Sequence, residues 1–178
     1  GVDSFYSLYS HLDEVTDLIF VVGFDIAVDN PELREQAAAM VRQVGAHLGK
    51  NVIEIETNLR QFLDRHVSWY WGHGPGLACI GHLLSGGFRR IYLASNQSVT
   101  NHTPVGSHPD LDPCWSSRSL EFIYDASKAT RFEKLRRLVS ENTVKDHLRV
   151  CWRNPGNVYN CGKCEKCLRT MVALEALG

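Results

Sequence analysis

Four cysteines near the C-terminus constrain this chain more than any other feature. They are Cys151, Cys161, Cys164 and Cys167, with nine residues between the first two and two residues between each later pair. Short C-x2-C turns supply pairs of thiolates to tetrahedral zinc. Two such turns overlap here, so we expect three thiolates on one knuckle, with Cys151 completing the set. The spacing therefore predicts a structural zinc site that has no open coordination position.

The residues around these cysteines suit a zinc site. Gly162 permits a tight turn, and the run Asn154-Pro155-Gly156-Asn157 bends the chain back between the first and second ligands. Lys163, Lys166 and Arg169 offset the negative charge of a zinc tetrathiolate and favour the thiolate over the thiol. Two disulfides, or four cysteines buried for unrelated reasons, remain the alternatives at this point.

The chain begins with Gly1-Val2-Asp3-Ser4, directly before a pattern in which Phe5, Leu8, Leu12 and Val15 recur at helical spacing. A turn of this kind places backbone N–H groups and the Ser4 hydroxyl at a helix N-terminus, where they can hold pyrophosphate oxygens. Asp3 would hold magnesium or fix the loop. Aspartate and serine are also good helix caps, so the run by itself favours an ordinary cap.

Together, the Gly-Val-Asp-Ser run and the cysteine spacing resemble the PP-loop ATP pyrophosphatase superfamily. Its members carry SGGxDS at the first strand–helix junction, and the branch of 7-cyano-7-deazaguanine synthase carries a four-cysteine site of this kind after its last strand. The resemblance implies that Gly1, Val2, Asp3 and Ser4 end the pyrophosphate loop. It also implies that the first strand and the opening Ser-Gly of the loop lie before Gly1, so that this sequence is truncated at its N-terminus.

The same resemblance implies an ATP-dependent enzyme that uses magnesium, with Asp3 and Ser4 as catalytic residues. A carboxylate or amide oxygen of a small substrate would attack the α-phosphorus, pyrophosphate would leave, and a nitrogen or sulfur nucleophile would displace AMP. A PP-loop α/β domain is expected over residues 1–150, and a zinc-binding four-cysteine element with a terminal helix over 151–178. Zinc held by four thiolates has no open position, so it should not activate water.

Composition agrees with a compact globular protein. The 178 residues are 44% apolar and 22% charged, which suits one domain with a sizeable core. A net charge of −1 gives no electrostatic case for nucleic acid or an acidic membrane, and no apolar run approaches the roughly 18 residues that span a bilayer. Four of the six cysteines have zinc spacing, which favours a reducing cytoplasm. We expect a small-molecule substrate as the partner, with no membrane and no nucleic acid, and a homodimer stays open.

Apolar patterns alternate between strands and helices along the chain. Strands are expected at 18–24, 52–55, 91–94 and 120–124, and helices after the first four residues, at 31–48, 77–84, 130–139 and 165–177. Asn30 and Pro31 form a helix start, and Gly49 a helix end. The alternation predicts an α/β fold with a doubly wound parallel sheet, which the resemblance makes a Rossmann-like sandwich of the HUP type with a C-terminal zinc knuckle.

Ligands of such sheets bind beyond the carboxyl ends of the strands, so function is expected in the loops there. The resemblance implies that the backbone at Gly23 meets the adenine, with Phe24 covering the ring and Asp25 near the ribose, although Asp25 also fits a solvated strand end. The run GHGPG at 72–76 is rich in glycine, which lets a ligand approach the backbone closely. His73, beside Gly74, is a candidate phosphate contact or proton donor, or else a structural histidine.

A polar loop at 95–118 is longer than compact domains usually keep without a role. We expect it to cover the substrate, with Asn96, His102, Trp115 and Ser116 recognising the acceptor. His102, His108, Asp110 and Asp112 match no tetrahedral metal spacing, so no second metal site is expected there.

Beyond that loop, Arg131 either faces phosphate or belongs to a solvated helix face with Lys128 and Lys134. Of the two remaining cysteines, Cys79 fits a core position and Cys114 a loop thiol. Two rival functions stay open. One is a zinc-ribbon module that binds tRNA or protein without catalysis, and the other is a degenerate PP-loop protein that senses nucleotide.

Overall fold

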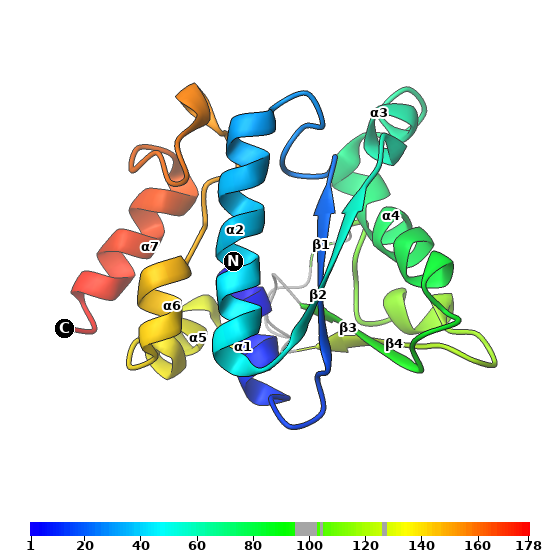
Figure 1. The fold of residues 1–178 in the computed structure, drawn as a ribbon, viewed down its shortest axis with the longest axis horizontal. Coiled ribbons are helices and arrows are strands. Elements are labelled where there is room, and N and C mark those ends of the chain that lie inside the picture. The colour runs from blue at the N-terminus through cyan, green and yellow to red at the C-terminus, as the bar shows by residue number, and fades with distance from the viewer. Residues whose placement is uncertain (95–102, 104, 126–127) are drawn as a thin grey trace. The chain divides into compact units, whose positions relative to one another are not determined.

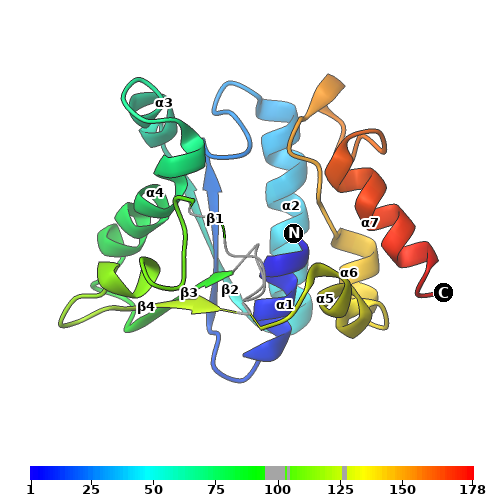
Figure 2. The same cartoon turned by 180° about the vertical axis from the view of Figure 1, so that it is seen from behind.

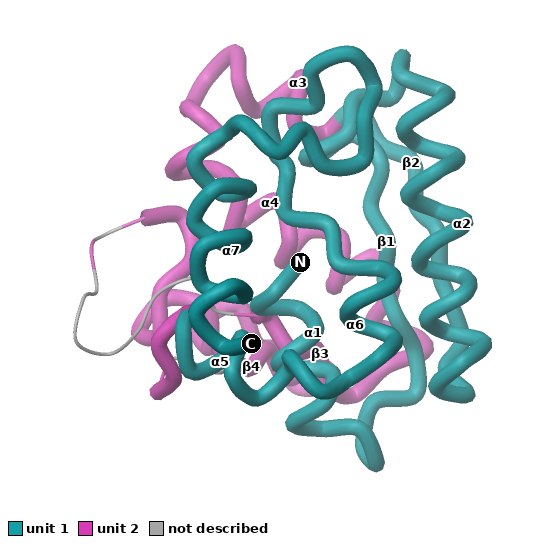
Figure 3. The backbone as a smooth tube through the Cα atoms, turned by 90° about the vertical axis from the view of Figure 1, so that its left-hand side faces the viewer, with its two compact units in different colours: residues 1–58, 132–178 teal, residues 59–131 magenta. Residues whose placement is uncertain are grey.

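Figures 1 and 2 show the chain as a computed structural model, which describes residues 1–94, 103, 105–125 and 128–178. The expected loop residues Asn96 and His102 lie outside the described residues. The chain divides into two compact units (Figure 3). Residues 1–58 and 132–178 form the first unit, and residues 59–131 form the second.

The first unit combines one strand pair with most of the helices. Its elements in chain order are α1 (Val2–Ser10), β1 (Asp17–Val22), α2 (Pro31–Leu48), β2 (Asn51–Glu56), α5 (Arg131–Leu138), α6 (Asn142–His147), the 3-10 turn η2 (Pro155–Asn157) and α7 (Glu165–Glu175). The second unit holds α3 (Leu59–Leu63), α4 (Trp69–Leu83), β3 (Arg90–Ala94), the 3-10 turn η1 (Asp112–Trp115) and β4 (Glu121–Asp125).

Helix α2 connects the parallel strands β1 and β2, which pair from Asp17 opposite Asn51 to Val22 opposite Glu56. The predicted helix start is confirmed, because the side chain of Asn30 accepts a hydrogen bond from the N–H of Leu33 at 3.2 Å. The predicted end is confirmed as well, since Gly49 has φ 65°, the left-handed conformation that glycine adopts without strain.

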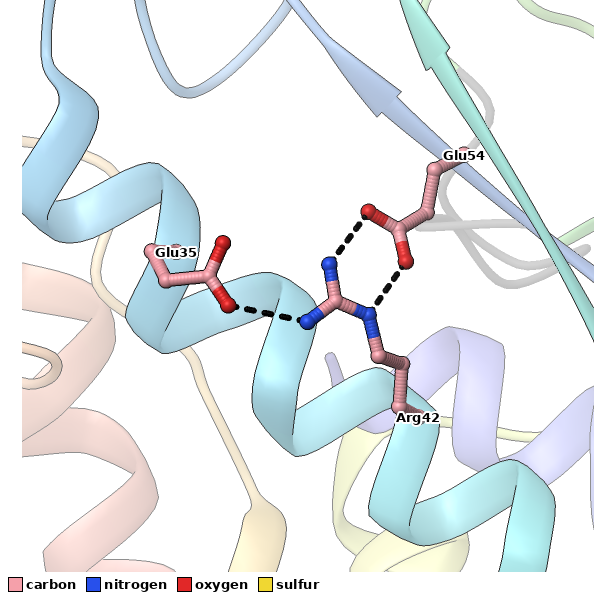
Figure 4. Close-up of polar contacts among 3 residues, drawn as sticks. All are labelled: Glu35, Arg42 and Glu54. Atoms are coloured by element: carbon pink, nitrogen blue, oxygen red, sulfur yellow. Dashed lines mark hydrogen bonds and ion pairs between the residues drawn. The ribbon is translucent and has the colours of Figure 1, made fainter.

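An exposed ion-pair network joins α2 to β2 (Figure 4). Arg42 donates through Nε and Nη2 to the two carboxylate oxygens of Glu54, at 2.5 and 2.9 Å, and through Nη1 to Glu35 at 2.8 Å. These hydrogen bonds raise the pKa of Arg42 and lower the pKa of Glu54. Exposed pairs contribute little to stability, so the network adds little free energy to the packing of α2 against β2.

The core of the first unit is shared by α1, α2, α5 and α6 (Figure 2). Its buried members are Val2, Phe5, Leu8, Val44, Leu135, Leu138 and Val144. Helix α6 was not predicted, because it has only six residues and a single apolar residue on its buried side. Val2, the first residue of α1, is 1% exposed, so the core holds the first turn of this helix.

In the second unit, β3 and β4 form another parallel pair, from Arg90 opposite Glu121 to Ala94 opposite Asp125. Phe122 on β4 is 1% exposed and packs with Leu93 and with Ala78 of α4. The described residues therefore show a mixed α/β protein with two short parallel strand pairs. They do not show one doubly wound sheet.

Two segments predicted as loops are helical. Helix α1 begins at Val2, so Asp3 and Ser4 belong to its first turn instead of preceding it. The run at 72–76 lies inside α4, with Pro75 in the helix interior. Its glycines let another part of the chain come close, because a Cβ on Gly74 would lie 1.7 Å from the carbonyl oxygen of Gly106. Among the described residues, no helix combines the length and apolar character needed to cross a membrane.

Candidate metal centre and nucleotide site

The four cysteines predicted as zinc ligands meet in one cluster. The sulfur atoms of Cys151, Cys161, Cys164 and Cys167 all lie within 4.8 Å of one another. Cys151 comes from the extended segment after α6, and the other three come from the turn that leads into α7 and from the first turn of α7 itself. Cys151, Cys164 and Cys167 are buried, whereas Cys161 is partly exposed.

Local backbone geometry explains why three of the sulfurs converge. Gly162 has φ 66°, which turns the chain directly after Cys161. The turn brings the N–H groups of Lys163 and Cys164 to 3.5 and 3.3 Å from the Cys161 sulfur. Cys167, one helical turn later, places its sulfur 3.9 Å from that of Cys161. The predicted knuckle is thus a consequence of one glycine turn and one helix start.

The geometry fits zinc. In a tetrahedral site with Zn–S bonds of about 2.3 Å, the sulfurs lie about 3.8 Å apart, close to the 3.9 Å between Cys161 and Cys167. A disulfide requires about 2.05 Å between sulfurs, and all four cysteines are free. Zinc is a borderline-soft cation, and four soft thiolates are a donor set typical of its structural sites. The cluster can therefore hold a metal such as zinc.

Main-chain hydrogen bonds and burial act in opposite directions on the pKa values of the four thiols. The main-chain N–H groups of Lys163 and Cys164 lower the pKa of Cys161, and the N–H of Cys167 lowers the pKa of Cys164. Burial, reinforced by the thiol of Cys164, raises the pKa of Cys167 to about 12. A metal that binds all four as thiolates must therefore displace a proton from Cys167, and a divalent cation supplies the charge that makes this favourable.

A single side chain holds the backbone around the first ligand. Oδ1 of Asn160 accepts hydrogen bonds from the N–H groups of Val150 and Cys151, at 2.9 and 3.2 Å. Its Nδ2 donates to the carbonyl of Leu148 at 2.8 Å. Asn160 directly precedes the second ligand, Cys161. Its side chain therefore connects the end of the segment between the first two ligands to the backbone at the start of that segment. Sequence reasoning did not single out this residue.

The predicted pyrophosphate loop forms the N-terminus of α1. Gly1 is the N-cap, and no side chain caps the helix. The side chain of Val2 is buried in the core, and Ser4 is exposed. Asp3 forms an ion pair with Lys134, whose Nζ lies 3.0 Å from Oδ1. Lys134 is 1% exposed, so its side chain does not lie on a solvated helix face.

The predicted adenine and ribose contacts lie in the loop after β1. Gly23 has φ 103°, and a Cβ there would lie 1.8 Å from the carbonyl oxygen of Thr57, so only glycine fits. Phe24 is buried, whereas Asp25 is exposed. The carbonyl oxygen of Asp25 accepts a hydrogen bond from Nδ2 of Asn154 at 2.7 Å. The structure thus connects this loop to the four-cysteine element.

The remaining predicted residues belong to the second unit. Nδ1 of His73 lies 3.1 Å from the carbonyl oxygen of Trp69 within α4, and Gly74 packs on Gly106. Oγ of Ser116 accepts a hydrogen bond from the N–H of Phe122 at 2.9 Å, and the carbonyl of Trp115 is 2.8 Å from Nε2 of His82. In the structure these side chains serve local packing and turn formation.

Asp112 is a buried carboxylate that the sequence placed in the polar loop at 95–118, where no metal site was expected. It is 0% exposed, accepts a hydrogen bond from Oγ of Ser107 at 2.5 Å, and accepts another from the N–H of His108 at 3.2 Å. Burial raises its pKa, and the two hydrogen bonds oppose that shift. Within the described part of the chain, the four cysteines are the one group that could hold a metal ion.

A cavity of about 340 Å³ lies beside the cysteine cluster, between α5, α6 and α7. It is lined mainly by apolar side chains such as Leu138, Leu148 and Leu174, and Cys167 lies on its wall. Its two uncharged polar side chains, Asn160 and Thr170, already form hydrogen bonds within the chain. A small-molecule site needs a few polar groups directed at the ligand, so we do not assign this cavity as the functional site.

Comparison with known proteins does not identify the chain: no family model, no curated protein and no solved structure matches it. Function must therefore be argued from the geometry of the first unit.

Proposed function

We propose that this chain is an ATP-dependent adenylating enzyme that holds the pyrophosphate part of Mg-ATP at the N-terminus of α1. One observation carries the proposal. The first turn of α1 is Val2-Asp3-Ser4, and its Asp3 is paired with a buried lysine, Lys134, at 3.0 Å. A buried ammonium group beside a helix N-terminus that has glycine as its N-cap is a combination that suits a polyphosphate.

Helix physics supports the choice of ligand. The first N–H groups of any helix have no intrahelical partner, and the dipole gives that end a partial positive charge. Gly1 leaves this end without a side-chain cap, and the exposed Ser4 hydroxyl stands in the first turn. Phosphate oxygens are typical ligands of such sites. Asp3 would coordinate the magnesium or share Lys134 with the phosphates.

The rest of the first unit is compatible with the sandwich that the proposal requires. The parallel pair β1–β2 with its connecting helix α2 is a βαβ unit, the building block of nucleotide-binding sheets. In the proposed complex, the loop at Gly23 and Asp25 receives the adenosine.

The reaction would proceed through an adenylate. An acceptor oxygen attacks the α-phosphorus, the bond to the bridging oxygen breaks, and magnesium pyrophosphate leaves. A nitrogen or sulfur nucleophile then displaces AMP. The protein contributes positioning and positive charge: the N–H groups of α1 and the ammonium of Lys134 stabilise the charge that develops on pyrophosphate. Zinc on four thiolates would have a structural role.

Isothermal titration of Mg-ATP into the protein tests the proposal. The Ser4→Ala variant should bind about tenfold more weakly, because a hydrogen bond to a charged group contributes roughly 1.5 kcal/mol. Ser10→Ala, on the exposed last turn of the same helix, is the matched control and should bind as the wild type does. If the wild type binds no Mg-ATP, the proposal is wrong.

A second measurement separates an enzyme from a nucleotide sensor. An enzyme should release pyrophosphate from Mg-ATP when a carboxylate or amide acceptor is supplied, and this release should fall in Ser4→Ala but not in Ser10→Ala. Binding of Mg-ATP without acceptor-dependent pyrophosphate release, over a broad panel of acceptors, would instead support the degenerate PP-loop sensor.

A further inference from the structure

The segment at 152–160, between the first and second cysteines, lies against the loop that follows β1. Two of its asparagines make the contacts. Asn154 donates through Nδ2 to the carbonyl of Asp25 at 2.7 Å. Asn157 accepts from Nδ2 of Asn30 at 2.8 Å and donates to Glu32 at 3.0 Å. Both sides of the β1–α2 connection are therefore held by residues of one short segment.

Both asparagines have a backbone conformation that few other residue types adopt. Asn154 has φ 50° and Asn157 has φ 58°, and they are the two non-glycine residues with positive φ among the described residues. Asparagine tolerates this region better than most residues. The side chains then point to the β1–α2 connection, and Arg149 donates through Nη2 to Oδ1 of Asn154, which leaves its amide nitrogen directed at Asp25.

An aromatic contact completes the interface. Tyr159 packs against the buried cluster of Ile26, Leu33 and Ala37, which belongs to the same loop and to the first turns of α2. Its hydroxyl donates to the carbonyl of His147 at 2.9 Å. The segment is thus connected through Tyr159 to the end of α6 as well as to the β1–α2 connection.

The ends of this segment are the metal ligands. Cys151 and Cys161 flank its nine residues, and their sulfurs lie within 4.8 Å of the other two. A metal on the four sulfurs closes the segment into a loop, so the binding of the metal removes part of the conformational entropy that opposes ordering of the segment. Without the metal, the same entropy opposes a few largely exposed hydrogen bonds and one aromatic contact, which are too weak to compensate for fixing nine residues.

We propose that segment 152–160 is a metal-dependent clamp on the β1–α2 connection, with Asn154 and Asn157 as its positioning residues. When zinc occupies the four cysteines, the clamp holds residues 23–30 in one conformation. When zinc leaves, the clamp and the loop lose order together. By linkage, any ligand that needs the ordered loop binds more tightly to the zinc-loaded protein, and zinc binds more tightly to the liganded protein.

Hydrogen exchange tests the clamp without any nucleotide. The amides of Gly23 and Asn30 are suitable reporters, because they donate to the carbonyls of Ile26 and Ala27 at 2.7 and 3.2 Å. Removal of zinc with a chelator should lower their protection by about tenfold or more, whereas the amides of β3 in the second unit should keep theirs. Unchanged protection at 23–30, with lost protection at 151–164, would overturn the proposal.

Substitution to glycine separates the clamp from metal binding. Glycine accepts positive φ, so Asn154→Gly combined with Asn157→Gly removes the side-chain contacts and keeps the turn. This variant should retain one zinc per chain and show the low protection of the zinc-free wild type at 23–30, and chelation should change it no further. Arg153→Ala is the matched control, since Arg153 is an exposed residue of the same segment that stacks on Trp152. If the double variant keeps wild-type protection, Asn154 and Asn157 are not positioning residues.

The consequence for ATP rests on the proposed function and fails separately from it. If the loop carries adenosine, zinc removal and the double glycine variant should each weaken Mg-ATP binding about tenfold, and Arg153→Ala should not. A protein that shows the hydrogen-exchange effect but binds no Mg-ATP would support the clamp and contradict the proposed function. If neither zinc removal nor the double glycine variant changes the affinity for Mg-ATP, the clamp does not affect nucleotide binding.

Discussion

The ammonium group of Lys134 lies 3.0 Å from Oδ1 of Asp3, and only 1% of the lysine is exposed. The two residues are 131 positions apart in the sequence, so one contact joins α5 to the first turn of α1. The ring of Tyr6, one turn further along α1, lies 5.9 Å from the same nitrogen. Asp3 thus compensates a buried cation at the helix end to which we assign the phosphates.

Loss of Asp3 should destabilise the protein more than loss of the pair. Asp3→Ala leaves the Lys134 ammonium buried without its carboxylate, which costs about 3 kcal/mol of unfolding free energy, the low end for buried pairs because Asp3 is partly exposed. In Lys134→Met combined with Asp3→Ala, both charges are removed and much of the stability should return. Urea denaturation of the two single variants and the double variant measures this. Equal stability of Asp3→Ala and the wild type would contradict a structural ion pair.

Zinc binding should depend on the cluster and not on cysteine in general. Metal analysis should give about one zinc per chain for the wild type. In Cys164→Ser, zinc content should fall strongly and thermal stability with it, because the binding free energy of a structural zinc is also folding free energy. Cys114→Ser is the matched control, since Cys114 is exposed and lies outside the cluster. Disulfides among the four, or equal loss in the control, would show that the cluster is not the zinc site.

Much of this arrangement follows from local sequence signals. Asn30, Pro31 and Gly49 predict the limits of α2 because caps depend on neighbouring residues alone. The C-x2-C spacing predicts the metal centre for the same reason, since Gly162 and a helix start bring three of the sulfurs together. Only Cys151 has to arrive from a more distant segment, and the sequence predicted that as well.

The contacts around the proposed nucleotide site are not local, which is why the sequence did not predict them. Nothing near Lys134 in the sequence indicates that it is buried, because Asp3 is far away in the chain. The helical state of residues 72–76 was missed because Gly and Pro both disfavour helices. Tertiary packing overrides that preference, since Gly74 and Gly106 approach at a distance that excludes any side chain. The partners of Asn154 and Asn157 are likewise set by the fold.

Asp112 should make the stability of the protein fall as pH rises. Because burial raises its pKa above the ordinary value of 3.8, the folded state favours the protonated form. This stability is fully present below pH 3.8 and is lost as pH increases through the raised pKa of the folded protein. In Asp112→Asn the loss is absent, and the amide can still accept from the N–H of His108 and meet Ser107.

Chemical denaturation between about pH 3 and pH 7 checks this expectation, with each variant compared with the wild type at the same pH. The unfolding free energy of Asp112→Asn, relative to the wild type, should rise with pH. Asp110→Asn, an exposed neighbour, controls for the change in net charge. A wild type that gains stability over Asp112→Asn as pH rises would mean that the hydrogen bonds from Ser107 and His108 outweigh burial.

Gly74 offers a way to distinguish a nucleotide contact from a packing requirement. A Cβ at this position would lie 1.7 Å from the carbonyl oxygen of Gly106, which is main chain and cannot rotate away. The N–H of Gly106 is also bonded to the carbonyl of Tyr70 at 3.0 Å, so the two segments are fixed against each other. Gly74→Ala should therefore lower the unfolding free energy by about 3 kcal/mol, at the upper end for overpacking.

The matched control for Gly74→Ala is Gly86→Ala, because a Cβ on Gly86 has no heavy atom within 4 Å and should change stability by less than about 1 kcal/mol. Gly74 belongs to the second unit, whereas the proposed phosphate contacts at Asp3 and Ser4 belong to the first. If Gly74 serves packing alone, the folded fraction of Gly74→Ala should bind Mg-ATP as Gly86→Ala does. A variant that keeps wild-type stability and loses Mg-ATP binding would instead make Gly74 a nucleotide contact, as the sequence first suggested.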